Sequence, residues 1–103
     1  MKIKAALLTG PKTPFIIEEL DLQEPKDGEV LIKLKACGVC HSDYHLVTGA
    51  TTHPMPCVAG HEGAGIVEAV GKGVTRVKVG DHVVLSWTPD CGECHYCQKG
   101  KPN

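Results

Sequence analysis

Short apolar runs that end at glycine and proline turns fill the first part of the chain. The run from Ile3 to Leu8 ends at Gly10-Pro11, and residues 15–22, apolar with acidic positions between, end at residues 25–28. Both endings are turn signals, so both runs predict strands. In residues 30–37, every second position is apolar and lysines hold two of the others, a period of two that predicts a half-buried strand.

The pattern changes after residue 40. Residues 41–46 predict one or two helical turns, opened by His41 or Ser42 and ended by Gly49. Further elements follow from the same signals: a loop with two prolines at 50–58, strands at 63–70 and 82–87, and a cysteine-rich loop from residue 88. Many short strands between glycine turns predict a mainly β fold, a small barrel or sandwich, and not a parallel sheet.

Length and charge narrow the function classes. A chain of 103 residues holds one domain or part of one. The net charge of −1 and the absence of a basic stripe argue against nucleic acid as a partner. No apolar run reaches the roughly 18 residues of a membrane span. Residues 1–10 lack the apolar core of a signal peptide, so we expect a cytoplasmic protein with no membrane partner.

Six cysteines are many for this length, and three of them are spaced as Cys91-x-x-Cys94-x-x-Cys97. Disulfides, a metal site and buried thiols are the alternatives. Without an export signal disulfides are disfavoured, and thiols this close together converge well on one ion. The spacing predicts metal, but a structural zinc and an iron–sulfur cluster both use four thiolates, so these residues leave both open.

A second group of metal-ligand residue types occurs in two glycine-flanked segments. Cys40 is followed by Asp43, and His61 by Glu62. A catalytic zinc takes three protein ligands and keeps one position open, and Cys40 and His61 are of the right types. They lie 21 residues apart, so only the fold can bring them together.

Four segments closely resemble the zinc-dependent medium-chain alcohol dehydrogenases: GVCHSDYH, GHEGAGIVEAVGKGV, VGDHVV and CGECHYC. The resemblance extends over the whole chain but only over the first part of the family's chain, and it favours zinc over iron. It implies a mainly β fold, the GroES-like β-barrel, with a short helix after Cys40 and a cysteine-rich zinc lobe at the C-terminal end. It also implies interconversion of an alcohol and its aldehyde or ketone with NAD(P).

The resemblance assigns roles residue by residue. Cys40 and His61 match two catalytic zinc ligands, and Glu62 an alternate ligand beside the metal. Asp43 matches the carboxylate that orients the zinc-bound histidine. The other matches are Ser42 and His45 for a proton relay, His41 for contact with the cofactor pyrophosphate, Trp87 for the substrate pocket, and Cys91, Cys94 and Cys97 for three of four structural zinc ligands. Without the resemblance, Trp87 would serve equally well in the core, and Cys37 and Cys57 are expected to be buried thiols.

The dinucleotide-binding fingerprint is missing from the sequence. Gly60, Gly63 and Gly65 have the wrong spacing for it, and the segment carries the ligand His61. We therefore interpret residues 1–103 as a partial GroES-like catalytic domain without the Rossmann cofactor domain. The isolated chain is predicted to be inactive, and the parent enzyme is expected to be a homo-oligomer acting on small alcohols or aldehydes. The rival hypothesis is a non-enzymatic zinc-binding module.

Overall fold

A computed structural model describes residues 1–88 and 91–100, which form six strands and two helices. The strands are β1 (Lys2–Leu8), β2 (Ile16–Asp21), β3 (Val30–Cys37), β4 (Cys57–Val58), β5 (Gly63–Val70) and β6 (His82–Val84), and the helices are α1 (His41–Thr48) and α2 (His95–Gln98). The prediction of a mainly β fold is confirmed, and every described strand pair is antiparallel.

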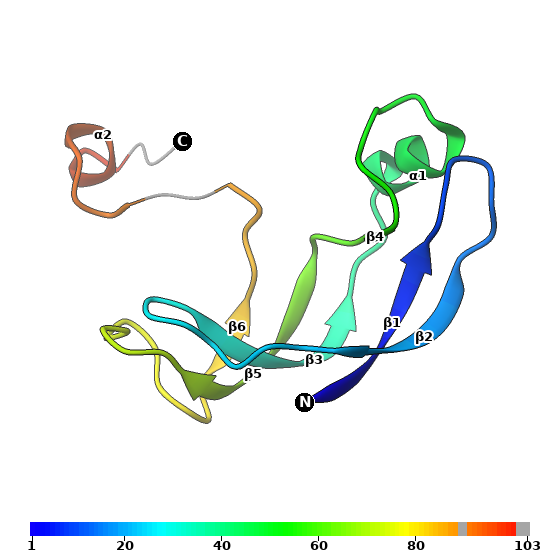
Figure 1. Ribbon diagram of the computed structural model, residues 1–103. Helices are drawn as coiled ribbons and strands as arrows, with labels where there is room; N and C mark the ends of the chain where they lie inside the picture. The colour runs from blue at the N-terminus through cyan, green and yellow to red at the C-terminus, as the bar shows by residue number, and fades with distance from the viewer. Residues whose placement is uncertain (89–90, 101–103) are drawn as a thin grey trace.

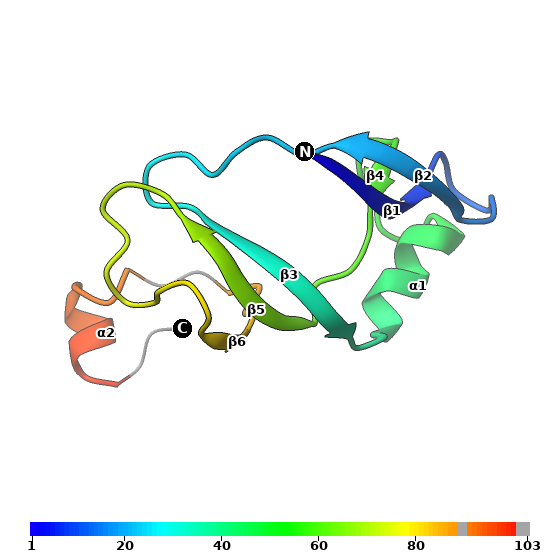
Figure 2. The same cartoon turned by 90° about the horizontal axis from the view of Figure 1, so that it is seen from below.

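The strands form two three-stranded sheets, ordered β2-β1-β4 and β3-β5-β6. Figures 1 and 2 show the two sheets side by side, with α1 next to the first sheet and α2 at the opposite end of the molecule. The pairing of β3 with β5 places Leu34 opposite Gly65 and Cys37 opposite Gly63. A side chain at Gly65 would collide with the backbone carbonyl of Lys33, so this close approach requires glycine.

Helix α1 has a well-defined start and end. Its N-cap Cys40 has extended backbone angles, and the Cys40 backbone N–H donates to Asp43 Oδ2 at 3.3 Å. Gly49 ends the helix in the left-handed conformation, at φ +83°, where glycine is favoured. The predicted helix and its glycine stop are confirmed. Among the described residues, neither helix has the length and apolar character needed to cross a membrane.

Three local predictions are corrected. Strand β6 stops at Val84 and does not reach Trp87. Its partner strand β5 begins at Gly63, whose carbonyl accepts the Leu85 N–H at 2.9 Å, so β5 offers no further residue for pairing. The predicted loop at 50–58 contains β4, which exists through its pairing with β1. The cysteine-rich segment contains the single-turn helix α2, closed by a 3.0 Å bond from the Gln98 N–H to the Cys94 carbonyl.

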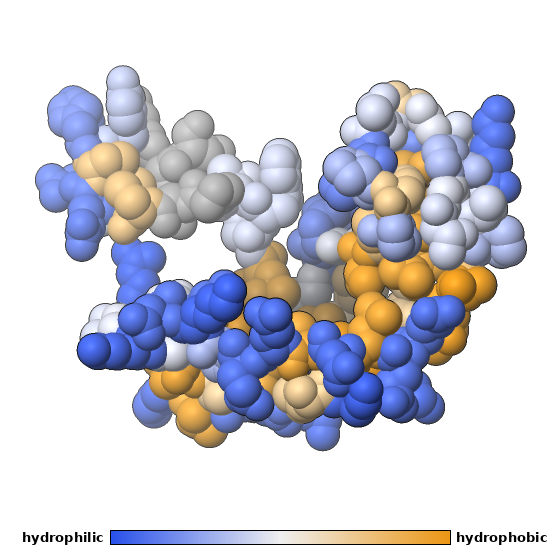
Figure 3. Space-filling view, viewed as in Figure 1, coloured by the Kyte–Doolittle hydropathy of each residue, from blue (hydrophilic) through white to orange (hydrophobic). Residues whose placement is uncertain are grey.

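The buried core of the described residues is small. Leu8 and Val67 are fully buried and Ala5 nearly so, whereas large apolar side chains elsewhere are exposed. Leu34 is 55% exposed, whereas residues 30–32 at the start of β3 are half-buried, so the predicted half-buried strand is found only in its first part. Figure 3 shows hydrophobic surface where β1 and β2 lie.

Candidate metal centres

The first candidate centre forms where β3 ends and β5 begins. Cys40 lies three residues beyond β3, and His61 and Glu62 lie directly before β5. Because the two strands run antiparallel with Cys37 opposite Gly63, the end of one meets the start of the other. The Gly38 N–H extends the pairing by donating to the Glu62 carbonyl at 3.0 Å. The strand register thus brings together residues that lie 21 positions apart.

The donor atoms of this centre converge. One ligand atom each from Cys40, His61 and Glu62 lies within 4.8 Å of the other two. Thiolate, imidazole and carboxylate are the ligand types that zinc takes in catalytic sites. The Glu62 carboxylate lies against Gly38, where a Cβ atom would come within 3.1 Å of Oε1. Glycine at position 38 therefore leaves room for Glu62 beside the thiol.

Asp43 connects both of the predicted ligands Cys40 and His61. Its Oδ1 is 3.4 Å from His61 Nδ1, while its Oδ2 accepts the Cys40 backbone N–H. The His61 side chain is only 28% exposed and that of Asp43 only 18%, so solvent screens the interaction between them weakly. A carboxylate behind a metal-binding imidazole fixes the ring orientation and tautomer. Asp43 has the position this role requires, and it holds the backbone of the cysteine as well.

Hydrogen bonds and charge shift both ligands. Hydrogen bonds from the Ser42 side chain and backbone, and a weaker one from His61, lower the pKa of Cys40. Partial burial opposes the shift at His61, but the hydrogen bond to Cys40 and the negative charges of Asp43, Cys40 and Glu62 raise its pKa. Metal binding needs thiolate and neutral imidazole, so the lowered pKa of Cys40 favours a metal ion, whereas the raised pKa of His61 strengthens proton competition at that ring.

The other residues of the predicted site lie around α1 and beyond β6. Ser42 Oγ donates to Cys40 Sγ at 3.2 Å, whereas the exposed ring of His45 lies against His41, with 4.7 Å between ring centroids. Within residues 1–88 and 91–100, no direct hydrogen bond joins Ser42 to His45. The Trp87 ring lies 6.4 Å from that of His61 and is 75% exposed, so it is no core residue of this structure.

Cys37 and Cys57 differ from their prediction as buried thiols. Cys37 is exposed and Cys57 half-buried, and both are free. Cys37 is the last residue of β3, in the second half of the strand, where the side chains are exposed. Neither cysteine belongs to a converging group of metal-ligand atoms among the residues described.

The second candidate centre is the lobe formed by residues 91–98. Its three sulfurs, from Cys91, Cys94 and Cys97, lie within 4.8 Å of one another. The Cys91 and Cys97 sulfurs are 3.9 Å apart, far beyond a disulfide bond of about 2.05 Å. Zinc–sulfur bonds of about 2.3 Å in a tetrahedron separate sulfurs by about 3.8 Å. The spacing therefore fits three thiolates around one zinc ion.

Backbone groups of the lobe favour its first thiolate. The N–H groups of Glu93 and Cys94 point at Cys91 Sγ, at 3.4 Å and 3.2 Å, and lower the pKa of Cys91 to about 7. A backbone hydrogen bond from Gly92 opposes the shift at Cys97, but its thiol neighbours and partial burial raise its pKa. With its pKa lowered to about 7, Cys91 is about half ionised at neutral pH, which favours binding of a metal cation.

Arg76, from the segment between β5 and β6, is a residue that the sequence prediction missed. At Gly92, which has φ +75°, a Cβ atom would collide with the Arg76 guanidinium. Arg76 thus packs on the lobe backbone, and only a side-chain-free residue in the left-handed conformation fits beneath it. No local signal in the sequence indicates this contact, because residues 76 and 92 belong to different elements.

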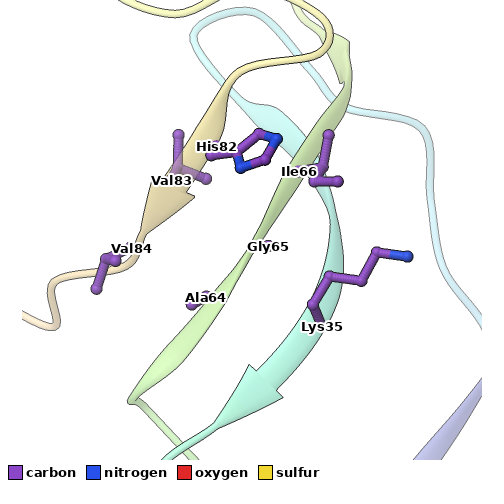
Figure 4. A pocket seen from close by; sticks show the side chains of 7 residues that line it. All are labelled: Lys35, Ala64, Gly65, Ile66, His82, Val83 and Val84. Carbon is purple, nitrogen blue, oxygen red and sulfur yellow. The ribbon is translucent and has the colours of Figure 1, made fainter.

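A groove of about 320 Å³ follows β3, β5 and β6 on the sheet surface. Figure 4 shows Lys35 and His82 at its borders, with the small residues Ala64 and Gly65 between them. None of the candidate metal ligands lines this groove. The candidate metal ligands lie instead where β3 ends and β5 begins, and in the lobe.

Residues 26–103 match the family described as the alcohol dehydrogenase GroES-like domain. The chain belongs to this family. It is 56% identical over its whole length to an NDMA-dependent alcohol dehydrogenase of Amycolatopsis methanolica, and 54% to a putative alcohol dehydrogenase D of Mycobacterium tuberculosis. It is 50% identical to an S-(hydroxymethyl)glutathione dehydrogenase of Photobacterium damsela subsp. piscicida. The chain spans 28% of the length of each of these relatives.

Solved structures of alcohol dehydrogenases share the fold. The chain superimposes with a TM-score of 0.88 on benzyl alcohol dehydrogenase from Acinetobacter calcoaceticus, at 42% identity, covering 99% of this chain and 28% of the other. It reaches 0.89, at 40% identity, with an alcohol dehydrogenase zinc-binding domain protein from Burkholderia ambifaria, covering 99% of this chain and 27% of that one. The predicted GroES-like fold is therefore confirmed, as is the resemblance to alcohol dehydrogenases.

Proposed function

We propose that residues 1–103 supply the zinc-binding part of the active site of an NAD(P)-dependent alcohol dehydrogenase. The observation that supports this most directly is the convergence of Cys40, His61 and Glu62 within 4.8 Å, with Asp43 behind the imidazole. Membership of the alcohol dehydrogenase family favours an alcohol and its aldehyde or ketone as the reacting pair. A third strong ligand would come from residues outside this chain.

Each residue of this centre has a separate proposed role in holding the metal ion. Zinc, when bound, supplies a Lewis acid that lowers the pKa of an alcohol hydroxyl. Cys40 and His61 would hold the ion, and Asp43 keeps the imidazole in the tautomer that presents Nε2 to it. Glu62, at the edge of the same group, is an alternate carboxylate ligand. The open position is where substrate would enter.

Ser42 and His45 would carry the alcohol proton to solvent. The Ser42 hydroxyl lies 3.2 Å from Cys40 Sγ, and His45 is exposed one helical turn further along α1. Without a direct hydrogen bond between them in the described structure, we propose that a water molecule or a substrate or cofactor hydroxyl completes the path. A relay of this kind accepts and donates one proton per turnover.

The remaining proposed roles concern the cofactor, the substrate and the lobe. His41 at the start of α1 is proposed to contact a cofactor phosphate, and Trp87 to line the substrate pocket beside His61. The residues that bind the nicotinamide would lie in a Rossmann domain outside residues 1–103. The lobe is proposed to hold a structural zinc with a fourth thiolate from outside the described residues.

The decisive experiment is an alcohol-dependent NAD(P) reduction assay on the full gene product that carries residues 1–103, with Cys40→Ser and His45→Gln variants. We expect Cys40→Ser to abolish turnover and His45→Gln to slow alcohol oxidation, most strongly at low pH, with unchanged zinc content. General acid–base groups typically contribute about 10²- to 10⁴-fold, and bypass by water reduces this.

Residues 1–103 alone serve as the control and should give no turnover, because their sequence lacks the dinucleotide-binding fingerprint of a domain that would hold the nicotinamide. A zinc-loaded full product that oxidises no alcohol would favour the non-enzymatic zinc module. An unaltered pH–rate profile in the His45→Gln protein would remove His45 from the mechanism.

A further inference from the structure

The first and fifth residues of α1 are both histidines. His41 and His45 form a His-x-x-x-His pair, and residues four apart lie on the same face of a helix. Their ring centroids are 4.7 Å apart with the ring planes at 78°, and both side chains are exposed. Two histidines at this spacing on one helix face are a known metal-binding arrangement in proteins.

The separation of the rings suits a shared ion. Metal–nitrogen bonds of about 2.0–2.1 Å, at angles between square-planar and tetrahedral, place two bound imidazole centroids about 4.5 to 5.3 Å apart. The observed 4.7 Å falls within that interval. Rotation of an exposed imidazole about its Cβ–Cγ bond redirects its nitrogens and leaves the ring centroid almost in place, so the centroid distance is the quantity that decides whether the two rings can share an ion. The backbone of α1 needs no change.

We propose that His41 and His45 form a third metal site, separate from the two candidate centres, for a divalent ion of the Ni²⁺ and Cu²⁺ class. An all-imidazole pair with water in the remaining positions suits these ions, and affinity rises from Mn²⁺ through Co²⁺ to Ni²⁺ and Cu²⁺. The site shares no ligand with the Cys40, His61 and Glu62 group, whose thiolate favours softer ions such as zinc.

The side chains next to His41 and His45 supply no further ligand to this site. The Tyr44 ring lies 5.6 Å from that of His41, and its hydroxyl is no competitor to imidazole for these ions. The Asp43 carboxylate is engaged by His61 and by the Cys40 N–H, so it is not free to join. The pair is therefore a two-ligand, solvent-facing site.

Occupation of this site has a consequence for catalysis, and that consequence, unlike the binding itself, rests on the proposed function. An ion shared by His41 and His45 would hold the side chains proposed for cofactor contact and proton transfer. Ni²⁺ or Cu²⁺ at concentrations that fill this site would then inhibit a dehydrogenase whose zinc is intact.

The test is calorimetric titration of untagged, zinc-saturated protein with Ni²⁺, with zinc release followed in the same samples. His41→Gln and His45→Gln should each weaken Ni²⁺ binding about tenfold or more, because the second imidazole acts at high effective concentration. The double variant should bind little more weakly than either single one. His82→Gln, which removes an exposed histidine from β6, is the matched control and should leave binding unchanged.

Two further measurements keep the outcome clear. Ni²⁺ should raise the Tm of the unaltered protein but not that of the His45→Gln variant, since only the former binds it tightly when folded. Circular dichroism checks that each variant retains its fold. Full Ni²⁺ affinity in either single variant, an equal loss in His82→Gln, or binding accompanied by stoichiometric zinc release would overturn the proposal.

Discussion

The two candidate metal centres are built in opposite ways. The lobe takes all three thiols from Cys91, Cys94 and Cys97, and backbone N–H groups of the same short segment point at the Cys91 sulfur. The Cys40 centre takes its ligands from two segments that meet only because β3 pairs with β5. The lobe is therefore determined locally, whereas the other centre depends on a correctly registered sheet.

That difference predicts separate responses to perturbation. A change at the β3–β5 pairing should damage the Cys40 centre and leave the lobe able to bind metal. A change within the lobe should do the reverse, because α1 and α2 lie at opposite ends of the molecule (Figures 1 and 2). The two centres share one property: hydrogen bonds lower the pKa of one cysteine in each, Cys40 in the first and Cys91 in the lobe.

The largest expected effect is loss of one metal ion. Cys94→Ser should empty the lobe of zinc, because a neutral hydroxyl replaces one of three thiolates, while the Cys40 centre keeps its ion. His61→Ala should produce the mirror image. Zinc per chain is measured by atomic emission after dialysis against a weak chelator, with Cys57→Ser as the control. Simultaneous loss of both ions in Cys94→Ser would contradict the independence of the two centres.

The next effect tests the sheet itself. Gly65→Ala should lower the free energy of unfolding by about 3 kcal/mol, because the new methyl group meets the Lys33 carbonyl and lies 2.9 Å from Ile32 Cγ2. Zinc retention should fall at the Cys40 centre and persist in the lobe. Urea denaturation measures the stability.

Gly10→Ala is the matched control for Gly65→Ala, since a Cβ atom at Gly10 meets nothing within 4 Å. Equal stability of the two variants would show that the β3–β5 register differs from the one described.

A smaller effect separates charge from geometry at the Cys40 centre. Asp43→Asn should weaken zinc binding there about 10- to 100-fold, as is typical when the partner of a metal-bound histidine is changed. The substitution also removes a charge that raises the pKa of His61, so fewer protons compete at low pH. The loss of affinity should therefore be greatest above the His61 pKa and shrink as the pH falls.

Competition with a chromophoric chelator across a pH series measures the Asp43→Asn effect, and Glu93→Gln in the lobe is the charge control. A pH-independent loss would show that Asp43 acts through geometry alone.

The smallest effect is a difference in reactivity within the lobe. In metal-free protein at pH 7, iodoacetamide should modify Cys91 before Cys97, because the pKa of Cys91 is lowered to about 7 and that of Cys97 is raised. The Cys91 rate should rise by no more than about twofold above pH 7, because about half of this thiol is already ionised at its pKa of about 7. Mass spectrometry of the labelled peptides follows both sites, and added zinc should protect them. Faster labelling of Cys97 would contradict the order of the two pKa values, with Cys91 below Cys97.

Local chemistry along the sequence was enough for several features. Glycine and proline turns bounded the strands β1, β2, β3 and β5 to within about two residues, since turn conformation depends on the residues in the turn. Gly49 ended α1 for the same reason. The convergence of three thiols in the lobe also follows from spacing alone, and the four quoted motifs led correctly to the GroES-like fold.

Features that depend on contacts between residues far apart in the chain could not be predicted from the sequence. β4 exists only as the neighbour of β1, and β6 ends where its pairing with β5 ends. The alternation in residues 30–37 indicated a half-buried strand but not that burial is confined to residues 30–32, because burial depends on what packs against the strand. The approach of Cys40 to His61, and of Arg76 to Gly92, likewise depends on strand register. Register is fixed by side-chain packing and hydrogen bonding across the whole sheet, so these contacts were decided by the tertiary structure.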